Sequence, residues 1–501
     1  MPAKKTRRSA VLALALLMAA AVPVRATTPP TFTVVDSIQP GSGSSYAMDA
    51  SESIAIGDYL YFTADDGTRG FELWRTNGTT TELVSDIRTG GASSYPYELT
   101  VLGDYLYFAA DDGTTGRELW RTNGTEVGTT RVADIRSGSA DSDIAALRAF
   151  GDDLYFTAND GTNGHELWRT SGTSTMRITD INVGAGNSYP YEPTVFNGFL
   201  YFGADDGTAG FELWRTDGST ATRVADIRVG AVGSNPYDLT AFGGYLYFGA
   251  DDGTDGFELW RTDGSTTTRI ADINVGFGGS SPIGLTPFGD HLYFRADDGS
   301  SGNELWRTNG TALGTTRVMD INTSTSASNA SNPEGFTAFN GHLYFQADDG
   351  TTGGELWRTD GSTTTQVDDI NSTGSDGSWP YVFIPLGDYL YFTAYDGTAS
   401  YVYRTNGTGT ELVPFPDAGQ RISCDCFDSH IVALGARLFS TVESAAIGHE
   451  FAYLDEPTYV LPETNRDGSV GSAWTIALSA LALVTLAAGV GLRRRSGAAQ
   501  R

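Results

Sequence analysis

Short runs of alternating apolar and polar residues cover most of the chain, with turn-forming residues between them. Within one such unit the alternation predicts four strands, over 99–102, 105–109, 117–122 and 130–135. Asn123-Gly124 is a strong signal for a two-residue hairpin between the third and fourth strands, and Gly103-Asp104 is the turn between the first two. In the second strand Leu106 and Phe108 point to one face of the sheet and Tyr107 to the other. Both faces therefore carry large apolar groups, as in a sheet that is covered on both sides.

The unit recurs with a spacing close to 46 residues. Its most regular marker is an aromatic residue in each third strand: Trp74, Trp120, Trp168, Trp214, Trp260, Trp306, Trp357 and Tyr403. A ninth, weaker unit follows, with Leu438-Phe439 and Glu450-Phe451 at strand positions. A period of this length with no helical stretch indicates the blade of a β-propeller rather than a helical solenoid. We therefore expect an all-β protein with a single β-propeller of eight or nine four-stranded antiparallel blades over 27–460.

Closure of the ring is expected to involve the N-terminal part of the chain. Residues 31–38 match the pattern of a fourth strand, such as that over 82–87, so the propeller begins with the end of a unit. This strand is predicted to complete the last blade. Residues 458–461 compete for the same place.

Composition agrees with many short strands and tight turns, since the chain has 62 glycines and is 12% aromatic. The formal charge is −29, but the basic residues are concentrated at the two ends. Between those ends 23 arginines and no lysine face 61 acidic residues, which gives about −38. Such a surface repels phosphate backbones and excludes nucleic acid as a partner. Multivalent cations, basic proteins and neutral glycans remain, and acidity that only maintains solubility is the alternative.

The two ends carry the marks of export and anchoring. Residues 1–26 combine a basic start, an apolar run over 10–24 and small or apolar residues at the cleavage subsites, which predicts a signal peptide. Residues 473–492 contain no charge and are long enough to span a bilayer as a helix. The basic tail over 493–501 would then stay in the cytoplasm. We expect an exported protein that is held at the cell surface with the propeller outside.

A pentapeptide precedes the apolar segment, within the spacer over 461–472. Its residues Leu461, Pro462, Glu463, Thr464 and Asn465, with the spacer, the apolar helix and the arginines behind it, resemble the cell-wall sorting signal of Gram-positive surface proteins. That signal reads Leu-Pro-any-Thr-Gly, so Asn465 stands where the family has glycine. The resemblance implies a sortase as partner, which would join Thr464 to the cell wall. A retained membrane anchor is the alternative.

The repeat itself resembles a known family. Glu212-Leu213-Trp214-Arg215-Thr216-Asp217-Gly218-Ser219 is similar to the marker of the ELWxxDGT repeat family of bacterial secreted proteins, with serine for the last threonine. The resemblance covers roughly residues 54–411. It implies a secreted or surface protein, and it implies no activity, because that family is defined by a repeat and not by an active site.

Aromatic residues in the connections between units are the candidate ligand-binding residues. In a four-stranded meander the second loop and the blade-to-blade connection share one face of the ring. The connections place there Tyr95, Tyr97, Tyr189, Tyr191, Tyr237, Trp379 and Tyr381. Aromatic side chains beside carboxylates and amides on a rigid, loop-bearing face are typical of sugar or peptide recognition. The alternative interpretation is that each Pro-Tyr pair packs a loop onto its blade.

Paired aspartates in the second loop are weak candidates for calcium ligands. They are Asp65, Asp66, Asp111, Asp112, Asp205, Asp206, Asp251 and Asp252. Calcium prefers several oxygen ligands, and two adjacent carboxylates supply too few. Aspartates before glycine in every unit are better explained by turns in which the carboxylate binds nearby backbone N–H groups. We expect no cofactor other than, at most, calcium.

Reactive side chains are few. Cys424 and Cys426 are the only cysteines, and in an exported protein a disulfide is favoured over a metal site with His430 and His449. No unit departs from the pattern with a new nucleophile and its base. The sequence therefore predicts a non-catalytic, surface-anchored module for binding, adhesion or display, whose ligand is a glycan or protein of the envelope or its surroundings. An extracellular carbohydrate-active hydrolase or lyase and a structural surface-layer or stalk protein are the alternatives.

Overall fold

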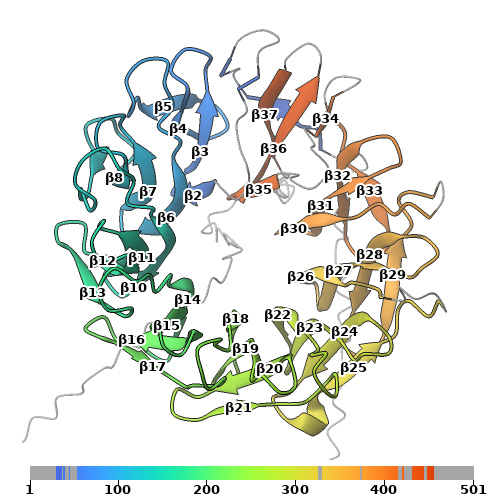
Figure 1. The fold of residues 1–501 in the computed structure, drawn as a ribbon. Coiled ribbons are helices and arrows are strands. Elements are labelled where there is room, and N and C mark those ends of the chain that lie inside the picture. Colours follow the sequence, from blue (N-terminus) through green and yellow to red (C-terminus); the bar gives the residue numbers. More distant parts are fainter. Residues whose placement is uncertain are drawn as a thin grey trace, which may run out of the picture.

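Nine antiparallel β-sheets form a closed ring in the computed structural model, each sheet standing as one blade (Figure 1). The structure describes residues 30–455 except 36–37, 40–43, 46–52, 325–329, 373–374, 416–419, 423–430 and 445–447. Within these residues the fold is all-β, and the only helix is the short 3₁₀ helix η2 (Ala312–Gly314). The predicted alternatives of eight and nine blades are therefore decided in favour of nine.

The strands of each blade run from the centre of the ring outward. The first, innermost strands are β2 (Ile54–Ile56), β6 (Tyr97–Leu102), β10 (Ala145–Phe150), β14 (Tyr191–Phe196), β18 (Tyr237–Phe242), β22 (Ile283–Phe288), β26 (Glu334–Phe339), β30 (Tyr381–Leu386) and, in blade 9, β34 (Arg421–Ile422) with β35 (Ile431–Leu434). The second strands are β3 (Tyr59–Asp65), β7 (Tyr105–Asp111), β11 (Asp153–Asn159), β15 (Phe199–Asp205), β19 (Tyr245–Asp251), β23 (His291–Asp297), β27 (His342–Asp348), β31 (Tyr389–Tyr395) and β36 (Arg437–Ser444).

The outer half of each blade is built in the same way. The third strands are β4 (Phe71–Thr76), β8 (Arg117–Thr122), β12 (His165–Thr170), β16 (Phe211–Thr216), β20 (Phe257–Thr262), β24 (Asn303–Thr308), β28 (Gly354–Thr359), β32 (Ser400–Thr405) and β37 (Gly448–Asp455). The fourth strands are β5 (Thr81–Ser85), β9 (Thr130–Arg131), β13 (Thr175–Thr179), β17 (Ala221–Arg223), β21 (Thr267–Arg269), β25 (Thr316–Met319), β29 (Thr364–Asp368), β33 (Thr410–Leu412) and, in blade 9, β1 (Thr33–Val34).

Apolar side chains on both faces of each blade form the cores between blades. Leu106 and Phe108 in blade 2 are fully buried against the Tyr61 side of blade 1. Tyr107, on the other face of the same strand, packs with Leu154 of blade 3. The alternation along the second strand thus joins each blade to both of its neighbours.

The ring is closed by a strand from the N-terminal part of the chain. In blade 9, β1 pairs antiparallel with β37, with Val34 opposite Ala452. Val35 shares a core with residues of blades 1 and 9, and the rings of Phe62 and Phe451 lie 4.5 Å apart within it. The segment predicted to complete the last blade therefore lies in the position of that blade's fourth strand.

A buried glutamate lies at the same place in eight of the nine blades, where it holds the blade-to-blade connection. In blade 1, Glu72 accepts hydrogen bonds from the backbone N–H groups of Ile87 (3.0 Å) and Ser94 (3.1 Å) and from the Ser94 hydroxyl (2.6 Å). Glutamates at the same place in seven further blades are Glu118, Glu166, Glu212, Glu258, Glu304, Glu355 and Glu450, and all are buried. Blade 8 has Tyr401 at this place, opposite Ala394 in the register of the repeat.

The glutamate also explains one error in the predicted strands. The fourth strand of blade 2 was predicted to reach Ile135, but β9 ends at Arg131. The N–H of Ile135 donates to Oε2 of Glu118 (2.8 Å) and not to a neighbouring strand. The chain therefore leaves the sheet early and begins its path to the next blade.

The two faces of the ring differ. We call the face with the second loops and the blade-to-blade connections the loop-bearing face, and the opposite face, with the tight turns, the hairpin face. Strand β37 runs from the former to the latter, because Asp455 at its end lies opposite Arg437 at the start of β36, with Nε and Oδ1 2.6 Å apart. Arg437 also bonds the carbonyl of Asn77, a hairpin residue of blade 1. The described chain therefore ends on the hairpin face.

Candidate ligand-binding pocket

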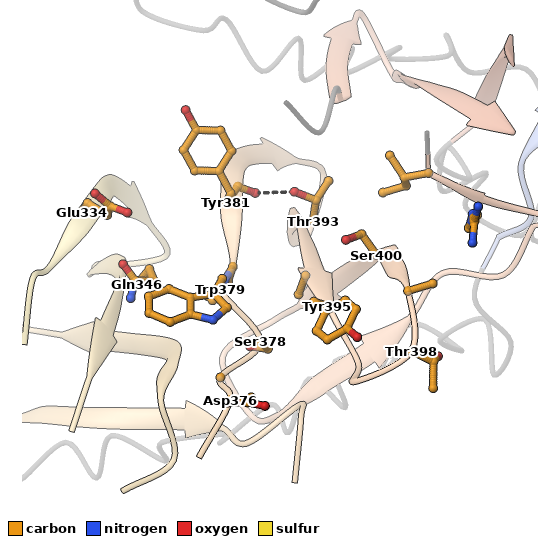
Figure 2. A pocket seen from close by; sticks show the side chains of 16 residues that line it. Glu334, Gln346, Asp376, Ser378, Trp379, Tyr381, Thr393, Tyr395, Thr398 and Ser400 are labelled. Atoms are coloured by element: carbon orange, nitrogen blue, oxygen red, sulfur yellow. Dashed lines mark hydrogen bonds between the residues drawn. The ribbon is translucent and has the colours of Figure 1, made fainter. Parts of the chain in front are cut away.

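A pocket of about 670 Å³ opens on the loop-bearing face at blades 7, 8 and 9 (Figure 2). Its walls come from the connection into blade 8, the second loop of blade 8 and strand β34 of blade 9. Three aromatic side chains line it: Trp379 is 51% exposed, Tyr381 48% and Tyr395 38%. Each is positioned by a departure from the repeat.

Trp379 rests on a glycine that only blade 7 has at this place. A Cβ atom on Gly354 would lie 2.6 Å from Cε3 and 2.9 Å from Cζ3 of the indole, so the six-membered ring covers bare backbone. The equivalent residue, which directly precedes the buried glutamate, is Phe71 in blade 1 and His165 in blade 3. The N–H of Trp379 donates to the carbonyl of Gly354 (2.8 Å), which fixes the connection above the strand. One face of the indole is thus covered and the side chain remains half exposed.

Tyr381 projects into the pocket because its usual position is occupied. In blade 4, Tyr191 lies opposite Gly203, where a Cβ would come within 2.2 Å of the tyrosine ring. The residue opposite Tyr381 is Thr393, whose hydroxyl donates to the Tyr381 carbonyl (3.1 Å; Figure 2). A β-branched side chain therefore fills the space that the glycine leaves open, and the ring of Tyr381 stays outside.

Tyr395 replaces an aspartate of the second loop. In blade 4 the corresponding Asp205 accepts a hydrogen bond from the N–H of Gly207 (2.7 Å). In blade 8 the tyrosine ring lies at this place and faces the pocket, across from Trp379 and Gln346 (Figure 2). The same blade has Tyr401 in place of the buried glutamate.

Polar groups lie between the aromatic walls. Gln346 is only 2% exposed, and its Nε2 atom has no hydrogen-bond partner among the residues that the structure describes. The carboxylates of Asp376 and Glu334 are exposed, the latter 3.5 Å from Arg295. The cationic group in the lining is Arg421, whose Nε is 2.5 Å from Oε1 of Glu443. The pocket therefore combines flat aromatic surfaces with carboxylates that can accept hydrogen bonds and with one amide nitrogen that has no acceptor among the described residues.

The structure divides the seven predicted ligand-binding residues into two groups. Tyr97, Tyr191 and Tyr237 pack between blades: the hydroxyls of Tyr97 and Tyr191 donate to the carbonyls of Ile144 (3.1 Å) and Pro236 (2.8 Å). The ring of Tyr237 lies over Gly249 in the same way as that of Tyr191 over Gly203. For these three the packing interpretation of the Pro-Tyr pairs describes their environment.

The other four are exposed on the loop-bearing face. Tyr95 stacks on Phe71 with ring centroids 5.5 Å apart, and Tyr189 stacks on His165 at 4.7 Å. Of these four residues, Trp379 and Tyr381 line the same pocket. Tyr395, Gln346 and Gly354 were not among the predicted residues, although each stands where blade 7 or 8 departs from the repeat.

The paired aspartates form turns. Asp111 accepts from the N–H of Gly113 (2.7 Å), and Asp112 accepts from the N–H groups of Thr114 (2.8 Å) and Thr115 (2.9 Å). The hydrogen bonds of the turn lower the pKa of Asp112 against the effect of burial, which raises it. In the part of the chain that the structure describes, no three carboxylate, histidine or cysteine side chains gather as a metal site. The turn interpretation thus accounts for these residues, and the calcium hypothesis gains no support.

Several predictions fall on residues outside the described part of the chain. These are Cys424 and Cys426, the signal peptide over 1–26, the motif over 461–465 and the apolar segment over 473–492. Across the described ranges, no helix combines the length and apolar character needed to cross a bilayer.

Both ring nitrogens of His165 lie within hydrogen-bond distance of side-chain oxygens. Its Nε2 lies 3.2 Å from Oδ2 of Asp143, and its Nδ1 lies 3.0 Å from Oδ1 of Asn187. Both ring nitrogens are thus directed at side-chain oxygens of neighbouring loops. This arrangement fixes the ring beneath Tyr189 and does not direct it toward a serine, threonine or cysteine.

No protein-family model matches the chain, and no curated protein matches it. Similar solved structures include a prolyl endopeptidase (13% identity, TM-score 0.39, covering 69% of this chain and 54% of that one) and puromycin hydrolase (14%, 0.37, 71% and 59%). The β-propeller domain of the Trilobed protease from Pyrococcus furiosus is also similar (9%, 0.36, 75% and 100%). This chain spans little more than half the length of the first two. At such identities and TM-scores, the likeness says nothing about an activity.

Proposed function

We propose that the protein is a non-catalytic, surface-anchored β-propeller that binds a component of the cell envelope or its surroundings. The observation that supports this most directly is the pocket at blades 7 to 9. There Gly354 lies under Trp379, Thr393 lies opposite Tyr381 and Tyr395 replaces an aspartate, so that three aromatic side chains lie exposed around a cavity of ligand size. Exposed aromatic side chains beside a few polar groups are typical of a binding site.

The position of the chain end also supports display. The described chain leaves the ring at Asp455 on the hairpin face, whereas the pocket opens on the loop-bearing face. An anchor through the predicted motif over 461–465 or the segment over 473–492 would therefore attach to the face opposite the pocket. In this proposal the loop-bearing face stays accessible, and membership of the ELWxxDGT repeat family explains the scaffold that carries it.

The binding proposal is tested with the full-length chain on isolated envelope fragments. A Trp379→Ala/Tyr381→Ala variant should lose most of its binding, because two of the three aromatic walls are removed. The matched control is Tyr95→Ala/Tyr189→Ala, which removes two aromatic residues of similar exposure from the same face but outside the pocket. Equal binding by wild type and the pocket variant, with both folded, would contradict the proposal.

The anchoring proposal has its own test. If a sortase cleaves after Thr464, mass spectrometry of the wall fraction should find the chain ending at Thr464, and Thr464→Ala should move the protein to the membrane fraction. A retained membrane anchor predicts that wild type and Thr464→Ala are both found in the membrane fraction with residues 473–492 still attached.

A further inference from the structure

We infer that the pocket at blades 7 to 9 is built for a neutral sugar ring, stacked on Trp379. The inference rests on the proposed binding function and adds to it the chemical class of the ligand. It follows from the shape of the aromatic walls, from the polar groups between them and from the balance of charge.

The indole of Trp379 provides a flat, supported platform. Gly354 lies under its six-membered ring, and a Cβ there would come within 2.6 Å, so the ring cannot sink toward the strand without meeting backbone. The side chain is nevertheless half exposed toward the pocket. A rigid aromatic face of this kind fits the C–H face of a pyranose, which is flat and apolar while its hydroxyls point outward around the rim.

The polar groups match those hydroxyls. Gln346 also lies over Gly354, with its Nε2 atom 2.6 Å from the position of the same Cβ, and this atom has no partner in the described residues. A buried amide without a partner is costly, and a ligand oxygen that accepts its hydrogen would remove that cost. The exposed carboxylate of Asp376 also lines the pocket and offers an acceptor to the donors of a ligand (Figure 2). Hydroxyl groups can serve both the donor and the acceptor, because each is itself a donor and an acceptor.

Charge excludes one class of ligand and disfavours another. Among the described residues that line the pocket, Asp376 and Glu334 are acidic, and Arg421 is in an ion pair with Glu443. An anionic sugar or a phosphate would meet carboxylates with no cation directed at it, on a molecule that is already strongly acidic. An organic cation would find acceptors and aromatic faces, but it offers no acceptor to Gln346. A neutral sugar matches the flat aromatic walls, the donor and acceptor groups between them and the absence of a cation free to bind an anion in the described lining.

The inference is tested by titration calorimetry of the full-length chain with four oligosaccharide probes: a neutral β-glucan, a neutral N-acetylglucosamine oligomer, a cationic glucosamine oligomer and an anionic galacturonic acid oligomer. At least one neutral probe should bind, with an affinity that changes little when the salt concentration is raised. Trp379→Ala should weaken that binding about 10-fold or more, whereas Trp379→Phe should keep a part of it. The Tyr189→Ala variant, which removes an exposed aromatic side chain from the connection between blades 3 and 4, should bind as wild type does.

Two further variants separate the ligand classes. Asp376→Asn should change the affinity for a neutral sugar by less than about 3-fold, but it would weaken the binding of a cationic ligand by about 10-fold. Gly354→Phe should displace the indole and reduce binding as Trp379→Ala does. Binding of the charged probes alone, or a wild-type affinity in Trp379→Ala, would overturn the inference. If envelope fragments bind the protein through the pocket but no neutral probe does, the inference fails while the proposed function stands; if envelope fragments do not bind, the proposed function fails first.

Discussion

The hydroxyl of Ser94 donates a hydrogen bond of 2.6 Å to Oε2 of Glu72, and the N–H of the same serine donates to Oε1 at 3.1 Å. This pair ties the connection entering blade 2 to the third strand of blade 1. Corresponding pairs include Ser234 with Glu212 (2.7 Å) and Ser378 with Glu355 (2.6 Å). A fully buried carboxylate is tolerable only when such donors satisfy it, so each pair couples the position of a loop to the integrity of a blade.

Replacing one of these glutamates should destabilise the ring. Glu212→Gln places an amide NH₂ among the N–H donors of Ile227 and Ser234, so at least one donor loses its acceptor. We expect a loss of about 1–3 kcal/mol in the free energy of unfolding, measured by chemical denaturation. Glu126→Gln is the control, because Glu126 is an exposed residue of a turn, and its stability should match that of wild type.

Stability should fall as the pH rises through neutrality. Burial raises the pKa of Glu72, Glu118 and Glu166 from 4.5 to about 7, despite the hydrogen bonds that lower it. Between these two values the folded state holds more protons than the unfolded chain, so stabilisation by these groups is complete below about pH 4.5 and is lost as the pH rises toward 7 and above. The melting temperature should therefore be higher at pH 5 than at pH 8. An equal or higher melting temperature at pH 8 would show that the hydrogen-bond donors lower the pKa of these glutamates more than burial raises it.

The aspartates of the second loops should affect the stability of the fold at acidic pH. Hydrogen bonds from Asn163 and Thr162 help to lower the pKa of Asp160 to about 2, although burial alone would raise it. Its stabilising effect is complete above about pH 4 and is lost as the pH falls toward 2. Asp160→Asn should therefore flatten the loss of melting temperature between pH 4 and pH 2 relative to wild type, and it should leave the slope between pH 5 and pH 8 unchanged.

A methyl group at Gly203 should disturb blade 4. Its Cβ would lie 2.2 Å from Cζ of Tyr191, so the ring must shift from its position over Gly203. We expect Gly203→Ala to cost about 1–3 kcal/mol of stability, as measured by chemical denaturation. Gly409→Ala is the matched control, since no atom lies within 4 Å of the added group. Wild-type stability in Gly203→Ala would contradict the explanation given for the outward position of Tyr381.

The closing strand should contribute strongly to stability. Phe32, next to β1, is 1% exposed and packs in the core between blades 8 and 9. Phe32→Ala should cost about 3–5 kcal/mol, whereas the neighbouring exposed Thr31→Ala should cost little. If both variants melt at the wild-type temperature, the N-terminal strand does not hold the ring together.

The fold could be predicted from the sequence because its determinants are local and repeated. The alternation around Leu106, Tyr107 and Phe108 predicts strands with two buried faces, and the spacing of the tryptophans predicts blades. The length of β9 could not be predicted, since it depends on how Glu118 binds the backbone of Ile135. The choice of nine blades over eight came from the structure, in which the weak ninth unit forms a sheet of its own.

The candidate pocket was predicted only in part, for a related reason. Trp379 and Tyr381 stood out as aromatic residues of a connection, but so did Tyr191 and Tyr237, which are half-buried between blades. What separates Tyr381 from Tyr191 is the residue across the strand pair, Thr393 or Gly203, and that pairing includes a bulge in the register. Departures from the repeat, such as Gly354 and Tyr395, were the available signal.

The pairing of β1 with β37 has a consequence for biosynthesis. Ile38 beside β1 donates to Glu450, 412 residues further along the chain, whereas blades 1 to 8 each contain all their strands in one continuous stretch. Those eight blades can form one after another as the chain emerges, but blade 9 must wait for the last strand to be made. Until then the edge of β1 is unpaired and open to strands of other chains. Among the strands that the structure describes, β1 is thus made first but pairs last.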